Sequence, residues 1–229
     1  MNQIINQFYG NRVSAEDGDI GKIEDFYFDD NAWVVRYLVV ETGSWLTGRQ
    51  VLLSPHAFEP GDPTLKGWRV HLTRKQIEDS PTLASHVPVS RQYETSYYRY
   101  YGWPGYWESG DVWGSHSVPL TVPESGPGAS SHHGHNQSKD VHLRSTQAIS
   151  RYHLHAVDGA IGRVTGFRMD PLKWTIQAIM ADTDHWNSGK TVFVPTRHIL
   201  GISYNERTVA IDLTKAKIEL TPADETVTR

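Results

Sequence analysis

The sequence predicts an all-β protein built from two small antiparallel β-barrels with short helical turns, joined by an aromatic segment and a flexible linker. Three observations lead to this fold class. One stretch is written twice, each copy alternates turn signals with short runs of β-branched and aromatic residues, and one aromatic block occurs only once. Five or six short strands in roughly 70 residues are typical of a small closed barrel.

The two copies align without a gap, so each residue of the second copy carries a number 141 higher than its counterpart. AEDGDIGKIEDFYFDDNAWVVRYLVV, which begins at Ala15, aligns with AVDGAIGRVTGFRMDPLKWTIQAIMA, which begins at Ala156. Features that recur are expected to serve the shared fold. Features that occur once are better candidates for a specific function.

The elements of each copy follow in one order. Asp17-Gly18 marks a tight turn after a short strand, and residues 20–29 form the next strand. A second turn follows at 29–31. The same signals recur at 158–171, so both copies are expected to open with a hairpin.

The strongest predicted strand is AWVVRYLVV, residues 32–40. Strict alternation places Trp33, Val35 and Tyr37 on one face and Arg36 on the other. The counterpart of Tyr37 is a small alanine, so the two copies are expected to pack differently.

The remaining signals lie at element ends. Pro55 and Pro195 are expected at strand ends, because proline cannot donate a hydrogen bond to a central ladder. Thr73 and Gln76 fit a capping box at the start of a short helix, and Pro81 ends it.

Each copy resembles a PRC-barrel domain. The DG-x-IG-[KR]-[IV] opening, the W-x-[VI] strand, the T-x-x-W-x-x-G-[KR] loop and the following [LF]-[LV]-x-P region carry the likeness, over about residues 8–81 and 149–222. The family includes the cytoplasmic part of the photosynthetic reaction centre H subunit and the C-terminal half of the ribosome maturation factor RimM. The resemblance implies a non-catalytic role built on protein contacts. This chain lacks the membrane helix of the former and the other half of the latter, so neither specific role carries over.

The aromatic block occurs once, in RQYETSYYRYYGWPGYW, residues 91–107. Ser90 is a predicted N-cap, Gly102 a predicted C-terminal cap, and the spacing of the tyrosines predicts a helix with an aromatic stripe at Tyr93, Tyr97, Tyr100 and Tyr101. The candidate protein-interaction residues are Tyr93, Tyr97, Tyr98, Tyr100, Tyr101, Trp103, Tyr106, Trp107 and Trp113.

Three interpretations of this block stay open. It covers the first barrel, or the groove between the barrels, within its own chain. It docks on the other subunit of a homodimer, since Tyr and Trp suit interfaces. It stacks on a sugar or on single-stranded nucleic acid, although such proteins normally add a basic groove.

The predicted domains are a first barrel at 1–82, an aromatic helix and loop extension at 83–113, a linker at 114–140 and a second barrel at 141–229. The linker is rich in Ser, Gly, Pro and His and shows no periodicity.

Composition excludes several classes of function. Without cysteine there are no disulfides, zinc-thiolate sites or cysteine nucleophiles, and a net charge of -4 argues against a nucleic-acid partner. The first residues do not resemble a signal peptide, and no apolar run is long enough to span a bilayer. We therefore expect a cytoplasmic protein that does not span a membrane, although it could dock on a membrane complex.

Candidate chemical groups are few, and no catalytic motif occurs. Asp182, Asp184 and His185 precede a tryptophan and could act as acid, base or ligand, although turn-favouring polar residues explain the same loop. Histidines in the linker could bind a divalent metal but would have to order the linker first. They are His132, His133 and His135.

Two recurring tryptophans are expected to fix their loops structurally, with glycines in the turns: Trp45 with Gly48, and Trp186 with Gly189. We therefore expect no enzyme, no cofactor and no metal site. The sequence predicts a non-catalytic adaptor that is a homodimer and assists or regulates a larger complex, with a photosynthetic or respiratory membrane assembly as one possible partner. The alternative is a small-ligand or metal binder using the Asp182 loop or the linker histidines.

Overall fold

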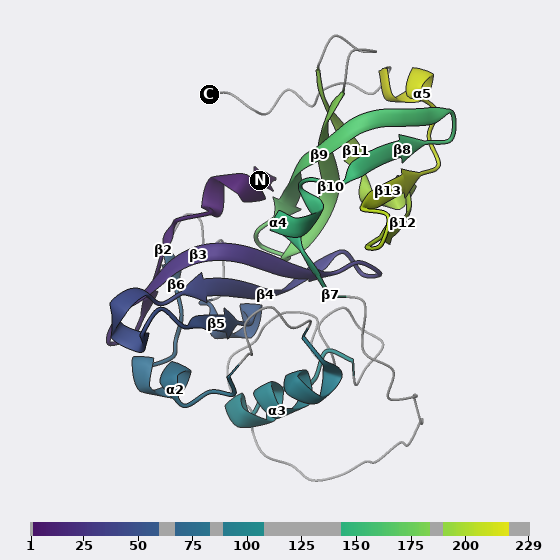
Figure 1. Cartoon of the computed structure of the whole chain (residues 1–229). Helices are drawn as coiled ribbons and strands as arrows, with labels where there is room; N and C mark the ends of the chain where they lie inside the picture. The colour runs from purple at the N-terminus through teal and green to yellow at the C-terminus, as the bar shows by residue number, and fades with distance from the viewer. Residues whose placement is uncertain (1, 60–66, 83–88, 108–142, 184–189, 220–229) are drawn as a thin grey trace, which may run out of the picture.

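The computed structural model describes residues 2–59, 67–82, 89–107, 143–183 and 190–219. These residues form a mostly β fold with a curled sheet and a few short helices (Figure 1), as the sequence predicts. Among them, no helix is both long enough and apolar enough to cross a membrane.

The first unit begins with a short strand and a 3₁₀ turn and ends with a short helix. Its elements are β1 (Gln3–Ile4), η1 (Ile5–Phe8), β2 (Arg12–Ala15), β3 (Gly18–Asp29), β4 (Val34–Glu41), η2 (Gly43–Leu46), β5 (Gln50–Leu53), η3 (Pro55–Ala57), β6 (Trp68–Arg69) and α2 (Arg74–Glu78). The helix α3 (Arg91–Tyr101) follows and has no counterpart later in the described chain.

The second unit follows a similar order, with β12 as an additional strand among the described residues. Its elements are β7 (Leu143–Ser145), α4 (Thr146–Ile149), β8 (His153–Ala156), β9 (Gly159–Asp170), β10 (Thr175–Thr183), β11 (Thr191–Pro195), η5 (Thr196–His198), β12 (Ile199–Ser203), β13 (Thr208–Ile211) and α5 (Lys215–Glu219). The pairs β2 and β8, β3 and β9, and α2 and α5 each begin 141 residues apart, which is the offset of the sequence repeat.

Local sequence signals set the ends of these elements as predicted. β5 ends just before Pro55, and β11 ends at Pro195. Thr73 caps α2 in a capping box: its hydroxyl accepts from the amide of Gln76 at 3.3 Å, and the Gln76 side chain accepts from the Thr73 amide at 2.8 Å.

All strands of the described residues belong to one sheet of thirteen strands, whose main path is β12-β13-β8-β9-β10-β4-β3-β2-β6. The two units join in the middle of this path, where Thr175 of β10 lies opposite Val34 of β4. Two separate barrels are therefore not confirmed. Each unit contributes its own hairpins, but the backbone hydrogen bonding continues from one unit to the other.

The junction between the units is reciprocal. β1 of the first unit pairs with β9 of the second, and β7 of the second pairs with β3 of the first. The amide of Val35 donates to the carbonyl of Trp174 at 2.8 Å, and the amide of Ile176 donates to the carbonyl of Trp33 at 2.7 Å. In the repeat, Val35 corresponds to Ile176 and Trp33 corresponds to Trp174, so each of these two hydrogen bonds is the counterpart of the other. The units therefore meet as the subunits of an isologous dimer do.

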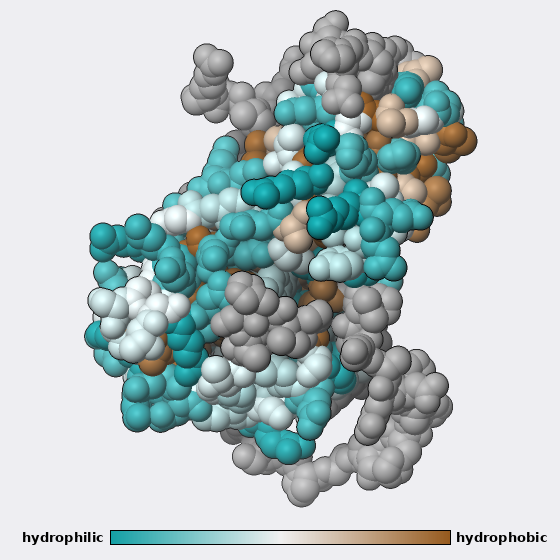
Figure 2. Space-filling view, viewed as in Figure 1, coloured by the Kyte–Doolittle hydropathy of each residue, from teal (hydrophilic) through white to brown (hydrophobic). Residues whose placement is uncertain are grey.

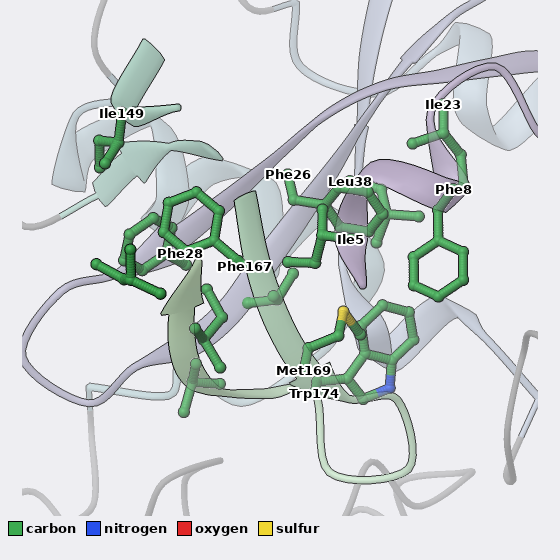
Figure 3. Packing of buried hydrophobic residues seen from close by; sticks show 14 of the residues in the cluster. Ile5, Phe8, Ile23, Phe26, Phe28, Leu38, Ile149, Phe167, Met169 and Trp174 are labelled. Atoms are coloured by element: carbon green, nitrogen blue, oxygen red, sulfur yellow. The ribbon is translucent and has the colours of Figure 1, made fainter. Parts of the chain in front are cut away.

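One hydrophobic core serves both units (Figure 3). The rings of Phe28 and Phe167 lie 5.5 Å apart, although they belong to different units. Trp174 reaches from the second unit to Phe58 at 5.2 Å and to Trp68 at 6.0 Å in the first. Because these side chains are buried against each other, we expect neither unit to keep its stability without the other.

The faces of β4 differ from the strict alternation that the sequence predicts. The register passes from Tyr27 opposite Tyr37 to Phe28 opposite Val35, which marks a bulge. Val35 therefore faces the main core, whereas Tyr37 faces the opposite side of the sheet. The prediction that Val35 and Tyr37 share a face is wrong. At the bulge, two steps along β4 match one step along β3, so Val35 and Tyr37 point to opposite faces.

Candidate interaction surfaces

The aromatic segment forms the helix that its sequence predicts. The Ser90 hydroxyl accepts from the amide of Tyr93 at 3.2 Å, and Gly102 closes α3 in the left-handed region with φ 71°. In Figure 1, α3 lies beside β4 and β5, on the side of the first unit away from the second. It thereby covers the outer face of the first unit, the sheet face opposite the main core.

The helix buries its rings within its own chain. Tyr97, Tyr98 and Tyr106 are buried, and with Tyr37, Val39, Leu52 and Val89 they form a second apolar cluster. Half-buried rings at its margin are Tyr93, Tyr101, Trp103 and Trp107. Tyr100 is 41% exposed. Trp113 lies outside the described residues.

The buried stripe is shifted from the predicted one. Tyr98 points inward in place of Tyr100, and Glu94 occupies the inner face one turn earlier. The sequence pattern assigned these positions by aromatic character alone. The inward position of Glu94 depends on its partner on the sheet, the hydroxyl of Tyr37, which the helix sequence does not contain.

Tyrosine hydroxyls satisfy backbone groups next to the end of β5. The Tyr97 hydroxyl donates to the carbonyl of Leu52 at 3.0 Å and accepts from the amide of Ser54 at 3.1 Å. The Tyr93 hydroxyl donates to the carbonyl of Pro81 at 3.0 Å. A buried polar backbone group without a partner is costly, so these positions favour tyrosine over phenylalanine.

Glu94 is the polar centre of this contact and is fully buried. Its Oε1 accepts from the hydroxyl of Tyr37 at 2.8 Å and from that of Tyr106 at 2.7 Å. Its Oε2 lies 3.1 Å from the Arg91 guanidinium, and the Arg36 guanidinium lies 3.8 Å from the Tyr106 ring centre. Burial raises the pKa of Glu94, while Arg91, the two hydroxyls and Arg36 lower it.

This carboxylate has the burial and the perturbed pKa of a catalytic group, but its surroundings favour a structural role. Both oxygens contact groups of the same chain, and two of those groups belong to the aromatic segment itself. The arrangement joins α3 to β4 through charge-assisted hydrogen bonds.

His56 completes the contact at the end of β5. Its ring stacks on Trp103 at 5.7 Å and meets the edge of Tyr98 at 5.9 Å. Burial, with a smaller contribution from Arg36, lowers the pKa of His56 to about 4. The imidazole is therefore neutral at pH 7.

Rings of this segment pack against other rings of the same chain, which argues against a role in stacking on a sugar or on nucleic-acid bases. Trp103 lies between His56 and Tyr101, and its centroid is 4.5 Å from that of Tyr101. The edge of Tyr100 meets Tyr101 at 4.8 Å. A groove of about 310 Å³ beside them is lined by His71, Leu72, Gln76, Tyr100, Tyr101 and Trp103.

Trp45 anchors its loop to the first unit. Its indole nitrogen donates to the carbonyl of Ile20, the Arg74 guanidinium lies 4.4 Å from its ring centre, and Gly48 adopts φ 72°. Trp186 and Gly189 lie outside the described residues, so the matching loop of the second unit is not compared.

The candidate chemical residues are only partly within the described chain. Asp182 is exposed on β10 and accepts a hydrogen bond from the hydroxyl of Thr191 at 2.7 Å. Asp184 and His185 lie outside the described residues, as do His132, His133 and His135. Across the described ranges, no three acidic or histidine side chains are grouped as metal ligands.

Four large apolar side chains of the second unit are exposed, which the sequence analysis did not find. Val157 is 69% exposed, Leu200 70% and Tyr204 68%, and Leu172 is exposed as well. Brown patches at the right of Figure 2 mark apolar surface at this end of the molecule. A signal was present in the repeat: FEPGDP at 58–63 aligns with ILGISY at 199–204, where no charge or proline interrupts the apolar run.

The sheet of the first unit, with its hairpins and its loop tryptophan, matches a known family. A PRC-barrel domain is present at residues 2–63. No curated protein matches the chain. The matched range runs from β1 past η3, so β6, α2 and α3 lie beyond it. The match does not extend to the second unit, whose likeness to the first rests on the shared offset of its elements.

Proposed function

We propose that the protein is a non-catalytic protein-interaction module, and that the second unit, a second PRC-type barrel, carries the contact surface. Leu200 and Tyr204 carry the proposal, because each leaves more than two thirds of its surface exposed and both belong to β12 and the turn after it. Exposed apolar surface concentrated in one place is typical of a binding site for another protein.

The first unit supports this assignment by contrast. Its outer face is occupied by α3, and three of the candidate tyrosines are buried there. The burial of these rings supports the first interpretation of the aromatic segment, the cover of its own unit. In the second unit, Leu200 and Tyr204 are exposed among the described residues, and they are the groups that we assign to contact with another protein.

The PRC-barrel match supports the non-catalytic part of the proposal, because domains of this family generally act through protein contacts. The resemblance also suggests the class of partner. A subunit of a membrane-bound photosynthetic or respiratory assembly belongs to this proposal, with the chain itself docking from the aqueous side.

Photo-crosslinking tests the proposed surface. Tyr204 is replaced by the photoreactive analogue benzoyl-phenylalanine, and the protein is irradiated in an extract of its native cells. We expect a discrete adduct with a protein, identified by mass spectrometry, because this side chain lies on the proposed surface. The same analogue at Tyr100 on the first unit is the matched control and should react more weakly. Adducts from Tyr100 alone, or from neither position, would contradict the proposal.

A further inference from the structure

β12 is the terminal strand of the sheet path and pairs, in the described residues, with β13 alone. Its register with β13 passes from Ile199 opposite Ile211 to Gly201 opposite Ala210. Leu200 is thus left without an opposite residue and is exposed. A Cβ added at Gly201 would meet nothing within 4 Å, so the sheet face is also open at this residue.

Natural proteins usually protect such an edge with charges or prolines. In the first unit, the aligned residues include Glu59, Pro60 and Asp62. β12 itself, ILGIS, contains none of these. Two other strands of this unit have one paired neighbour among the described residues: β11, which ends in a proline, and β7, which contains Arg144. The β12 edge is therefore the least protected of the three.

Charges of opposite sign flank β12. Arg197 lies in η5, two residues before the strand, and Glu206 lies in the turn, three residues after it; both are exposed, as is Arg207 next to Glu206. An antiparallel alignment of β12 with an identical strand places the residue before one strand beside the residue after the other. Arg197 of one copy then lies beside Glu206 of the second, and the pair occurs twice about the two-fold axis. The neutral strand between them brings no like charges together.

We propose that β12 is a self-association edge, at which the hairpin of β12 and β13 packs antiparallel against the same hairpin of a second copy. The inference rests on the proposed interaction surface and names its occupant. The chain already assembles its two units through short exchanged strands, β1 on β9 and β7 on β3, so strand addition is how these units associate. The contact is smaller than a typical stable interface, so we expect a dimer that dissociates on dilution.

Sedimentation equilibrium over a concentration series tests the proposal with charge reversals. Arg197→Glu and Glu206→Arg should each weaken the dimer about tenfold, because each places like charges together twice. The double variant should restore wild-type association. Lys173→Glu, an exposed reversal in the turn between β9 and β10, is the matched control and should leave association unchanged.

Two results would overturn the proposal: a wild-type protein that is monomeric at every concentration, or a double variant that dimerises no better than the single ones. Leu200→Glu provides a second readout and should abolish association while the circular dichroism spectrum stays unchanged. The proposed function fails separately. If position 204 crosslinks a different protein while the wild type is monomeric, the interaction surface stands and the second copy is excluded.

Discussion

The outer faces of the two units show how one fold can be completed in two ways. Tyr37 and Ala178 occupy the same position of the repeat, and both are fully buried. In the first unit, the large tyrosine needs a partner for its hydroxyl, and α3 supplies Glu94. In the second unit, the small alanine presents no polar group. Phe193, the counterpart of Leu52 in the repeat, lies under the Arg168 guanidinium, which is 5.1 Å from its ring centre. The face with the larger polar side chain is the one that acquired a helix.

This difference also separates the surfaces available for binding. The first unit packs most of its described aromatic rings against its own sheet, beside a groove lined in part by Tyr100, Tyr101 and Trp103. The second unit leaves apolar side chains exposed at its far edge. The aromatic block is the most conspicuous feature of the sequence, yet Tyr97, Tyr98 and Tyr106 are buried within the chain.

The largest expected effect concerns the core that both units share. Trp174→Ala should lower the free energy of unfolding by about 3–5 kcal/mol, because Trp174 is 3% exposed and packs against the first unit. Urea unfolding followed by circular dichroism measures this loss, and both units should unfold in one transition. Trp33→Ala is the matched control, since Trp33 occupies the same repeat position with nearly the same φ but is only half-buried. An equal or larger loss at Trp33 would show that the buried Trp174 contributes no more to stability than its half-buried counterpart.

An intermediate effect tests the outer faces directly. Ala178→Tyr gives the second unit the residue of the first, and it should lower the free energy of unfolding by about 1–3 kcal/mol, because the buried site lacks both room and an acceptor. Ala210→Tyr, at an exposed position on β13, should cost little in the same urea experiment. A neutral Ala178→Tyr would mean that the second unit can open its outer face, and that the two units differ less than their packing indicates.

The last prediction depends on pH and concerns His56, whose place in the second unit is taken by Arg197. The pKa of His56 is lowered from 6.5 to about 4, so the unfolded chain binds this proton first as the pH falls. Its contribution to stability is present above pH 6.5 and is lost as the pH falls toward 4.

The measurement is the difference in unfolding free energy between wild type and His56→Phe across this range. Taking the difference cancels the opposite effect of Glu94 and Asp25, whose raised pKa values stabilise the fold as the pH falls. The slope should approach about 1.4 kcal/mol per pH unit. A difference that does not change with pH would show that His56 titrates normally in the folded protein.

Much of the local structure could be predicted from the sequence, and particular residues show why. Ser90, Gly102, Thr73 and Pro55 act through their own backbone geometry or through a hydrogen bond to a residue two or three positions away. Such interactions join residues that are close together in the sequence, so the sequence pattern reveals them. The faces of β4 could not be predicted in this way, because the bulge beside Tyr37 arises only when β3 is paired with it.

The sequence by itself determined that the chain is a duplication, because a constant offset of 141 residues with matching turns, strands and caps survives in the order of residues. Only the tertiary structure decided that the duplicated units exchange β1 and β7, share one core and cover one of their two outer faces with α3. The physical reason is the range of the interactions. Turns and caps join near neighbours in the chain, whereas burial depends on which distant surfaces meet, and identical patterns at two sites cannot tell which partner each one finds.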